Sequence, residues 1–147
     1  MTAQTQMTAD EIIALLRLRP HPEGGWYRQT WADTNEGRSH GTCIYFLLKA
    51  GERSHWHRVV DATEFWIYNA GAPVALSLSE TDQGPATEII VGPDLVAGQR
   101  PQGMVPANWW QAARSTGEWS LVSCTVSPGF LFEKFVLAAP DFDIPRA

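Results

Sequence analysis

The stretch that decides the fold runs from residue 51 to residue 71 and reads GERSHWHRVVDATEFWIYNAG. It contains two strand-like segments, and a glycine stands at each end of it. His55 and His57 are two residues apart, so both side chains point to the same face of a regular strand. Glu64 opens the next strand, and a tight connection would bring its carboxylate near the two imidazoles. This group is the first candidate for a functional site.

The chain on both sides of this stretch reads as short strands separated by turns. Strand-like runs include WYRQTW, TCIYFLL, WWQAAR and WSLVSCTVS, and the runs PVALSLSE and TEIIVG predict a hairpin. Nine or ten such strands predict an all-β sandwich or barrel, formed by one domain over residues 1–147. Thr8 and Glu11 form a capping-box pattern that predicts a helix over 9–18, and FEKFVLA is a candidate second helix.

Composition excludes several classes of protein. The 147 residues are 44% hydrophobic and 18% charged, which indicates a globular domain. The net charge is −5 and the eleven basic residues are scattered, so we expect no nucleic-acid partner. No run approaches the ~20 apolar residues of a membrane span. No signal peptide is recognisable, which predicts a cytoplasmic protein with free Cys43 and Cys124 thiols, and residues 1–7 are predicted to be disordered.

The spacing of Gly51, His55, His57, Glu64 and Gly71 resembles the first motif of the cupin superfamily. That motif has a glycine, a His-x-His pair, a glutamate and a second glycine.

A match to the second cupin motif follows later in the chain. Gly98 is followed by Pro106, Asn108 and Gln111, where cupins have proline, glycine and histidine. Asn108 fits the glycine position if the backbone there needs a positive φ.

A closer resemblance is to the cupin_5 group, once classed as a domain of unknown function. Its segments are matched in order by EGGWYRQTW, CIYFLL, SHWHRVVDATEFWIYNAG, VPANWWQAA and SLVSCTVSPGF, over roughly residues 9–142. The resemblance implies a cupin double-stranded β-helix, or jelly-roll barrel, with a short N-terminal helix. It also implies a homodimer and a small-molecule ligand.

The cupin resemblance implies a possible metal site made of His55, His57, Glu64 and Gln111. Such a set would hold a divalent ion of iron, manganese, nickel or zinc. Two departures bear on this expectation. Six residues separate His57 from Glu64, where cupins have three or four, and an amide oxygen at Gln111 is a weaker ligand than imidazole. The alternative is a metal-free pocket in which His57 is a general base.

Some cupins without a metal also resemble this pattern in outline. They include sugar-nucleotide epimerases, in which a histidine abstracts a proton next to a keto group. By that resemblance His57 would be the base, Asp61 or Glu64 would orient it, and Tyr45 or Tyr68 would return the proton. The resulting hypothesis is an isomerase, epimerase or metal-dependent enzyme acting on a small polar metabolite, such as a sugar or sugar nucleotide. The alternative is a cupin that binds or senses a ligand without turnover.

Side-chain alternation suggests further pocket residues. Trp66 shares the face of Glu64, and Trp109 is expected inside the barrel with Gln111, while Trp110 is expected to pack outside or at a dimer contact. Arg28 is a candidate for binding an anionic ligand, and a surface salt bridge is its alternative role. His21 and His40 lie near turns and are predicted to be solvated.

Overall fold

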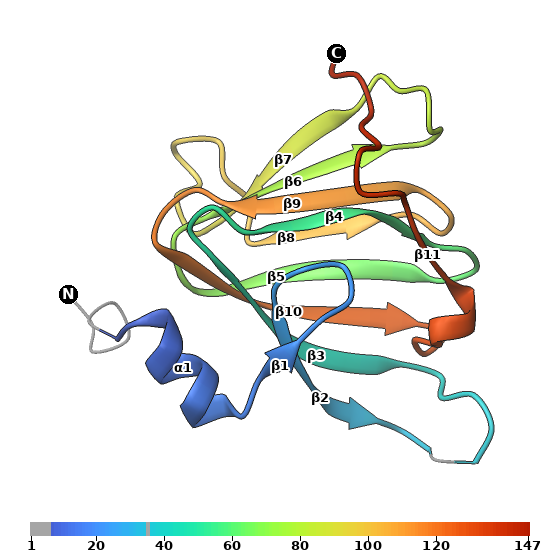
Figure 1. The fold of residues 1–147 in the computed structure, drawn as a ribbon, viewed down its shortest axis with the longest axis horizontal. Coiled ribbons are helices and arrows are strands. Elements are labelled where there is room, and N and C mark those ends of the chain that lie inside the picture. The colour runs from blue at the N-terminus through green and yellow to red at the C-terminus, as the bar shows by residue number, and fades with distance from the viewer. Residues whose placement is uncertain (1–6, 35) are drawn as a thin grey trace.

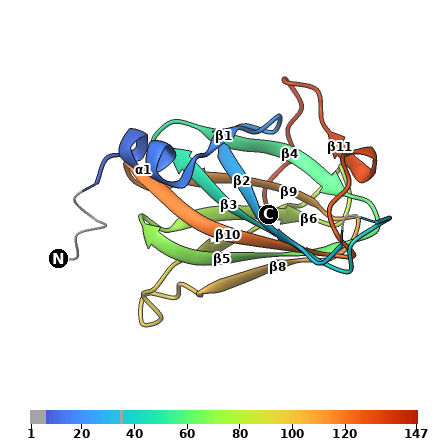
Figure 2. The same ribbon diagram turned by 90° about the horizontal axis from the view of Figure 1, so that it is seen from below.

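The computed structural model describes residues 7–34 and 36–147, whose strands form two antiparallel sheets packed face to face (Figures 1 and 2). The six-stranded sheet has the order β1 (Arg19–Pro20), β2 (Trp26–Ala32), β3 (Thr42–Lys49), β10 (Trp119–Ser127), β5 (Thr63–Gly71) and β8 (Gln102–Val105). The five-stranded sheet has the order β11 (Phe135–Leu137), β4 (Arg53–Val59), β9 (Trp110–Ser115), β6 (Val74–Ser79) and β7 (Thr87–Val91). The predicted β6–β7 hairpin is confirmed.

The two strands of the 51–71 stretch lie in different sheets. β4 belongs to the five-stranded sheet and β5 to the six-stranded sheet, so the short turn between them crosses from one layer to the other. His57 and Glu64 therefore face each other across the interior rather than side by side. Apolar side chains of both sheets fill one end of that interior: Phe46, Leu48, Trp66, Val74, Leu76, Leu78, Val91, Val105, Ala113, Val122 and Cys124.

Helix α1 (Ala9–Leu16) packs on the outside of the six-stranded sheet at one end of the molecule (Figure 1). The predicted capping box between Thr8 and Glu11 is present. The helix ends two residues before the predicted boundary because Arg17 adopts a left-handed φ of 57°. Of the residues predicted to be disordered, Met7 accepts a hydrogen bond at its carbonyl oxygen from the Trp119 indole N–H, at 3.0 Å. Residues 1–6 lie outside the described residues.

The segment FEKFVLA forms a 3-10 turn (Phe132–Lys134) and the short strand β11 instead of an α-helix. After it, residues 138–147, the C-terminal tail, run across the outer face of the five-stranded sheet (Figure 1). Ile144 of the tail is fully buried against Trp56 and Ala86. No helix within the described ranges is long and apolar enough to cross a membrane.

An irregularity in β4 controls which of its side chains enter the barrel. Ser54 pairs with Ala113 of β9 and His57 pairs with Gln111, so three steps along β4 match two along β9. The extra residue breaks the inward–outward alternation. His57 points into the barrel, whereas His55 points outward and its Nε2 lies 2.7 Å from the carbonyl oxygen of Ala139 in the tail. The expectation that both imidazoles share one face is therefore wrong.

Candidate acid–base pocket

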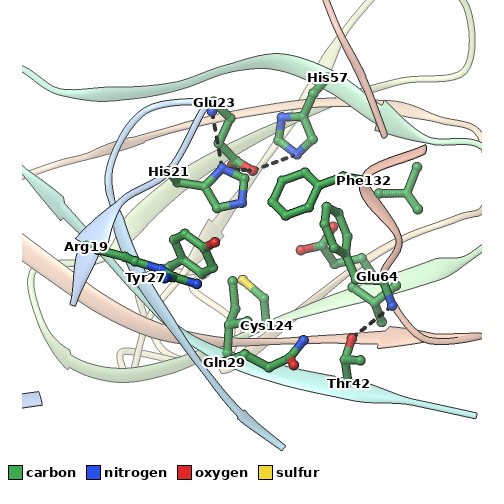
Figure 3. Close-up of a pocket in the computed structure, with 14 residues that line it drawn as sticks. Arg19, His21, Glu23, Tyr27, Gln29, Thr42, His57, Glu64, Cys124 and Phe132 are labelled. Atoms are coloured by element: carbon green, nitrogen blue, oxygen red, sulfur yellow. Dashed lines mark hydrogen bonds and ion pairs between the residues drawn. The ribbon is translucent and has the colours of Figure 1, made fainter. Parts of the chain in front are cut away.

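A cavity of about 170 Å³ opens between the two sheets and holds most of the buried ionisable groups of the barrel (Figure 3). We call it the barrel pocket. Its walls are Arg19, His21, Glu23, Tyr27, Gln29, Thr42, Ile44, His57, Val59, Glu64, Cys124, Val126, Phe130 and Phe132.

His57 of β4 lies in this pocket with its tautomer defined by the backbone. Its Nδ1 is 2.7 Å from the carbonyl oxygen of His55. Because a carbonyl only accepts, Nδ1 carries the hydrogen and Nε2 is left as an acceptor in the neutral ring. Burial lowers the pKa of His57, so the ring is neutral at pH 7. An imidazole held in this way can act as a base through Nε2.

Glu23 approaches His57 from the loop between β1 and β2. Its Oε1 is 3.6 Å from His57 Nε2 and 3.3 Å from His21 Nδ1 (Figure 3). Ser54 donates a hydrogen bond to Oε2. Burial raises the pKa of Glu23 to about 8. At neutral pH the carboxyl group keeps its proton, so it faces both imidazoles as a potential donor.

His21 is buried beside Glu23, so the prediction that it is solvated is wrong. The backbone N–H of Glu23 donates to His21 Nδ1 at 3.2 Å, and the ring packs edge-on against Tyr27 with centroids 4.5 Å apart. Burial, together with the charge of His57, lowers the pKa of His21 to about 3. The loop can fold inward because Gly24 has a φ of 106° and approaches the Arg53 carbonyl too closely for any side chain.

Glu64 of β5 faces the pocket from the opposite sheet. Gln111 Nε2 donates to Glu64 Oε1 at 2.9 Å, and Trp66 Nε1 donates to Gln111 Oε1 at 2.7 Å. The indole N–H fixes the amide orientation, because only an oxygen can accept from it. Burial raises the pKa of Glu64 to about 7, and the charge of Glu23 contributes to the rise. Gln111 therefore positions Glu64, whose carboxyl group also interacts with the Cys124 thiol in the pocket wall.

The mouth of the pocket carries a cation and a group of aromatic rings. Arg19 of β1 places its guanidinium 5.4 Å from the Tyr27 ring centroid. Within the described part of the chain, no acidic group forms an ion pair with Arg19. Phe130 and Phe132 pack edge to face, with centroids 4.9 Å apart, and form the apolar wall.

The structure separates several residues that the sequence grouped together. Tyr68 donates its hydroxyl to the Gly71 carbonyl at 2.8 Å and does not line the pocket. Arg28 is on the outer face of β2, where it bonds to the Leu16 carbonyl and lies over Tyr45. Asp61 forms a two-pronged ion pair with Arg38 at the surface.

The tryptophans follow the expected alternation more closely. Trp66 is buried behind Glu64, and Trp109 packs against the barrel core near it. Trp110 packs on the outside of the sheet against Phe142 of the tail. Asn108 has the positive φ, 71°, that its place in the second motif requires.

The four residues of the expected metal site do not converge. His55 is on the other side of the sheet, and the oxygen of Gln111 accepts from Trp66 rather than facing the pocket. Across residues 7–34 and 36–147, no group of three histidine, cysteine or acidic side chains is arranged to hold a metal ion. The residues present therefore do not fit the metal that the sequence pattern suggests, and the chemistry below is argued from side chains alone.

Comparison with known proteins decides the family. Residues 10–138 match the model of the Cupin_5 family, described as "Cupin superfamily (DUF985)". The chain belongs to this cupin family. The cupin double-stranded β-helix expected from the sequence is thereby confirmed, since solved cupin structures match the same architecture. A comparison with functionally curated proteins gave no significant match.

Two solved structures are similar to this cupin over nearly its whole length. Protein SO0799 from Shewanella oneidensis is 39% identical, with 90% of this chain and 85% of that chain covered and a TM-score of 0.83. A hypothetical protein from Leishmania major is 32% identical, with 90% and 88% covered and a TM-score of 0.81. A dTDP sugar isomerase from Desulfovibrio desulfuricans, 15% identical over 84% of this chain and 88% of its own, shares the fold with a TM-score of 0.59.

Proposed function

We propose that this cupin is an enzyme that transfers protons on a compact polar metabolite, in an isomerase or epimerase reaction. The observation that carries the proposal is the surroundings of His57. Its Nε2 is a free acceptor in a buried cavity, with Glu23 on one side and Glu64 on the opposite sheet. Groups that can accept and donate a proton near pH 7 thus face one small space, which is what general acid–base catalysis requires.

His57 and Glu64 can together carry out a two-step proton-transfer reaction. His57 Nε2 takes the proton from a carbon next to a substrate carbonyl, while protonated Glu64 donates to the carbonyl oxygen and an enediol forms. In an isomerisation, protonated His57 returns the proton to the former carbonyl carbon, and the hydroxyl on the neighbouring carbon gives its proton to ionised Glu64, which regenerates both side chains. In an epimerisation, Tyr27 or Glu23, which also line the space, donates a proton to the opposite face of the original carbon. The enediol hydroxyl then returns its proton to Glu64, and protonated His57 passes its proton through solvent to the donor that lost one.

The size and charge of the pocket favour a small substrate with an anionic or strongly polar end. A cavity of about 170 Å³ is below the ~300–1,000 Å³ typical of ligand pockets. It has room for the reacting part of a sugar, and the rest of a sugar nucleotide would have to extend past the mouth. Arg19 at the mouth is suited to bind such an anionic group.

Solvent-deuterium exchange tests the proposal, because it detects proton transfer whatever product is formed. Dihydroxyacetone, fructose and pyruvate are incubated with the protein in D2O, and loss of the α C–H signal is followed by proton NMR. We expect exchange that falls by roughly 10²–10⁴-fold in His57→Asn. The matched control is His40→Asn, because His40 is exposed and contacts Asp33 at the surface.

Equal exchange rates in wild type and His57→Asn would contradict the proposal. Binding of these compounds without exchange would favour the second candidate, a cupin that senses or stores its ligand. The polar cavity is compatible with that role as well, but a binding site has no need of an acid and a base on opposite walls.

A further inference from the structure

A second cavity lies on the outer face of the five-stranded sheet, on the other side of β4 from the barrel pocket. We call it the outer hollow; it has a volume of about 150 Å³ and is bounded by β4, β6, β9 and the C-terminal tail. Its floor is made of small side chains, Ala75 and Ser77 of β6 and Ala112 of β9. Leu76 and Leu78 of β6 enter the barrel core, so Ala75 and Ser77 point away from it.

Three arginines surround this floor. Arg53 of β4 and Arg114 of β9 are direct cross-strand partners, an arrangement in which like charges repel. Arg146 of the tail is the third, with its guanidinium 5.3 Å from the Trp56 ring centroid.

The acidic groups near the outer hollow only partly offset these charges. Asp143 accepts hydrogen bonds from the Trp56 indole and the Ile144 N–H as well as from Arg146. Glu88 Oε2 is 3.8 Å from Arg114 and is largely exposed. Three cations thus face two carboxylates, in a chain whose net charge is −5. The hollow is a locally positive site on an acidic protein.

A buried hydroxyl group completes the site. Ser77 is 6% exposed, and it lines the hollow. A ligand oxygen that accepts from the Ser77 hydroxyl gains a hydrogen bond at the base of the hollow. A donor at the base of a ring of arginines matches an oxyanion, since guanidinium groups bind such anions through paired N–H donors.

We propose that the outer hollow binds a phosphoryl group, supplied as free phosphate or by a small phosphorylated metabolite. A phosphate monoester carries a charge of about −1.5 to −2 at pH 7. This charge complements three arginines better than the single negative charge of a carboxylate does. Ser77 donates to one oxygen, and Arg53, Arg114 and Arg146 neutralise the others. This site is distinct from the barrel pocket, although Ser54 contributes to the hollow and donates its hydroxyl hydrogen bond to Glu23 inside.

Calorimetric titration at constant ionic strength tests the site with two probes, inorganic phosphate and glycerol 3-phosphate, with acetate as the carboxylate comparison. We expect both phosphates to bind, and the tighter of the two identifies the source of the group. The double variant Arg53→Gln/Arg114→Gln should bind at least about tenfold more weakly, since each lost charge-assisted contact is worth about a factor of ten or more. Ser77→Ala, which removes one oxygen atom, should weaken binding several-fold.

Two further variants locate the bound phosphate. Arg100→Gln, which removes an exposed arginine that does not line the hollow, should bind phosphate like the wild type. Arg19→Gln removes the cation at the barrel pocket, so phosphate binding that persists in this variant belongs to the outer hollow. If circular dichroism shows that the double variant does not fold, Ser77→Ala decides.

Absence of phosphate binding to the wild type would overturn the proposal, and so would unchanged affinity in Ser77→Ala and the double variant. Loss of binding in Arg19→Gln alone would place the anion in the barrel pocket instead. Equal displacement by acetate or chloride would reduce the site to non-specific attraction and overturn it as well. None of these results depends on whether the barrel pocket is catalytic.

Discussion

Burial sets the protonation of the pocket residues in opposite directions, and each shift favours the neutral form. The pKa of Glu23 rises to about 8 and that of Glu64 to about 7, whereas the pKa values of His21 and His57 fall. Removing a charge from water is unfavourable for acids and bases alike, so acids hold their protons and histidines lose theirs. The result is a buried set of neutral groups, in which the carboxyl groups hold protons to donate and His57 has a free nitrogen to accept one.

The shift at Glu23 predicts a stability that depends on pH. Between its ordinary pKa of 4.5 and its folded pKa of about 8, the unfolded chain has lost the proton that the folded chain keeps. The folded state then binds more protons, so stability falls as the pH rises through this window, by up to about 1.4 kcal/mol per pH unit. Above pH 8 this contribution levels off.

The measurement compares urea unfolding of wild type and Glu23→Gln at pH 5, 6.5 and 8. The free energy of unfolding of the wild type should decline relative to the variant over this range. Glu80→Gln, at an exposed position, serves as the control and should follow the wild type. Parallel curves for wild type and Glu23→Gln would show that Glu23 ionises normally.

Among the elements, β4 shows where a regular strand pattern fails. A regular strand would place His55 and His57 on one face, but the extra residue before His57 turns His55 toward the tail. A one-residue insertion reverses every later side chain, and such irregularities depend on the pairing partner rather than on the strand's own residues. The helix cap, the hairpin and the left-handed Asn108 are local features, and each was predicted correctly.

The glycines at the ends of the 51–71 stretch should differ in their tolerance to substitution. Both have a positive φ, 80° at Gly51 and 81° at Gly71. A Cβ at Gly51 meets nothing within 4 Å, whereas a Cβ at Gly71 would come within 2.5 Å of the Trp119 ring and 2.6 Å of its carbonyl oxygen. Gly51→Ala should therefore lose only the ~1–2 kcal/mol of left-handed strain.

Gly71→Ala adds a steric clash to the same strain, and we expect it to lose about 1–3 kcal/mol more. Chemical denaturation of the two variants measures the difference directly. Equal losses of stability in the two variants would mean that Trp119 moves away from the added methyl group at no cost in stability.

At the scale of the whole molecule, other segments cover parts of the outer faces of both sheets, but the outermost strands keep an unpaired edge. The tail covers the outer face of the five-stranded sheet, and α1 covers one end of the six-stranded sheet. β8 is the outermost strand of that sheet, and Met104 on it is 47% exposed. An apolar edge strand is a template for pairing with another chain. We propose that two copies of this cupin pair as a homodimer through this edge, in line with the dimer expected from the sequence.

Sedimentation analysis tests the dimer. We expect a species of twice the 16.3 kDa chain mass, and a shift toward the monomer in Met104→Lys, which places a charge on the edge. Thr87→Lys, on the edge strand β7 of the other sheet, should leave the mass unchanged. A wild-type protein that sediments only as a monomer would refute the pairing.

The sequence by itself determined the all-β class, the cupin family, the positions of most strands and the choice of His57 and Glu64, because these depend on periodicity, glycines and motif spacing along the chain. Only the tertiary structure decided which side chains lie beside His57 and Glu64 in the pocket. Glu23, His21 and Tyr27 reach the pocket because a glycine loop folds against β4, and His55 leaves it because of the pairing with β9. Both outcomes depend on contacts between distant segments, which no local pattern encodes. The same contacts bury these side chains and so shift their pKa values.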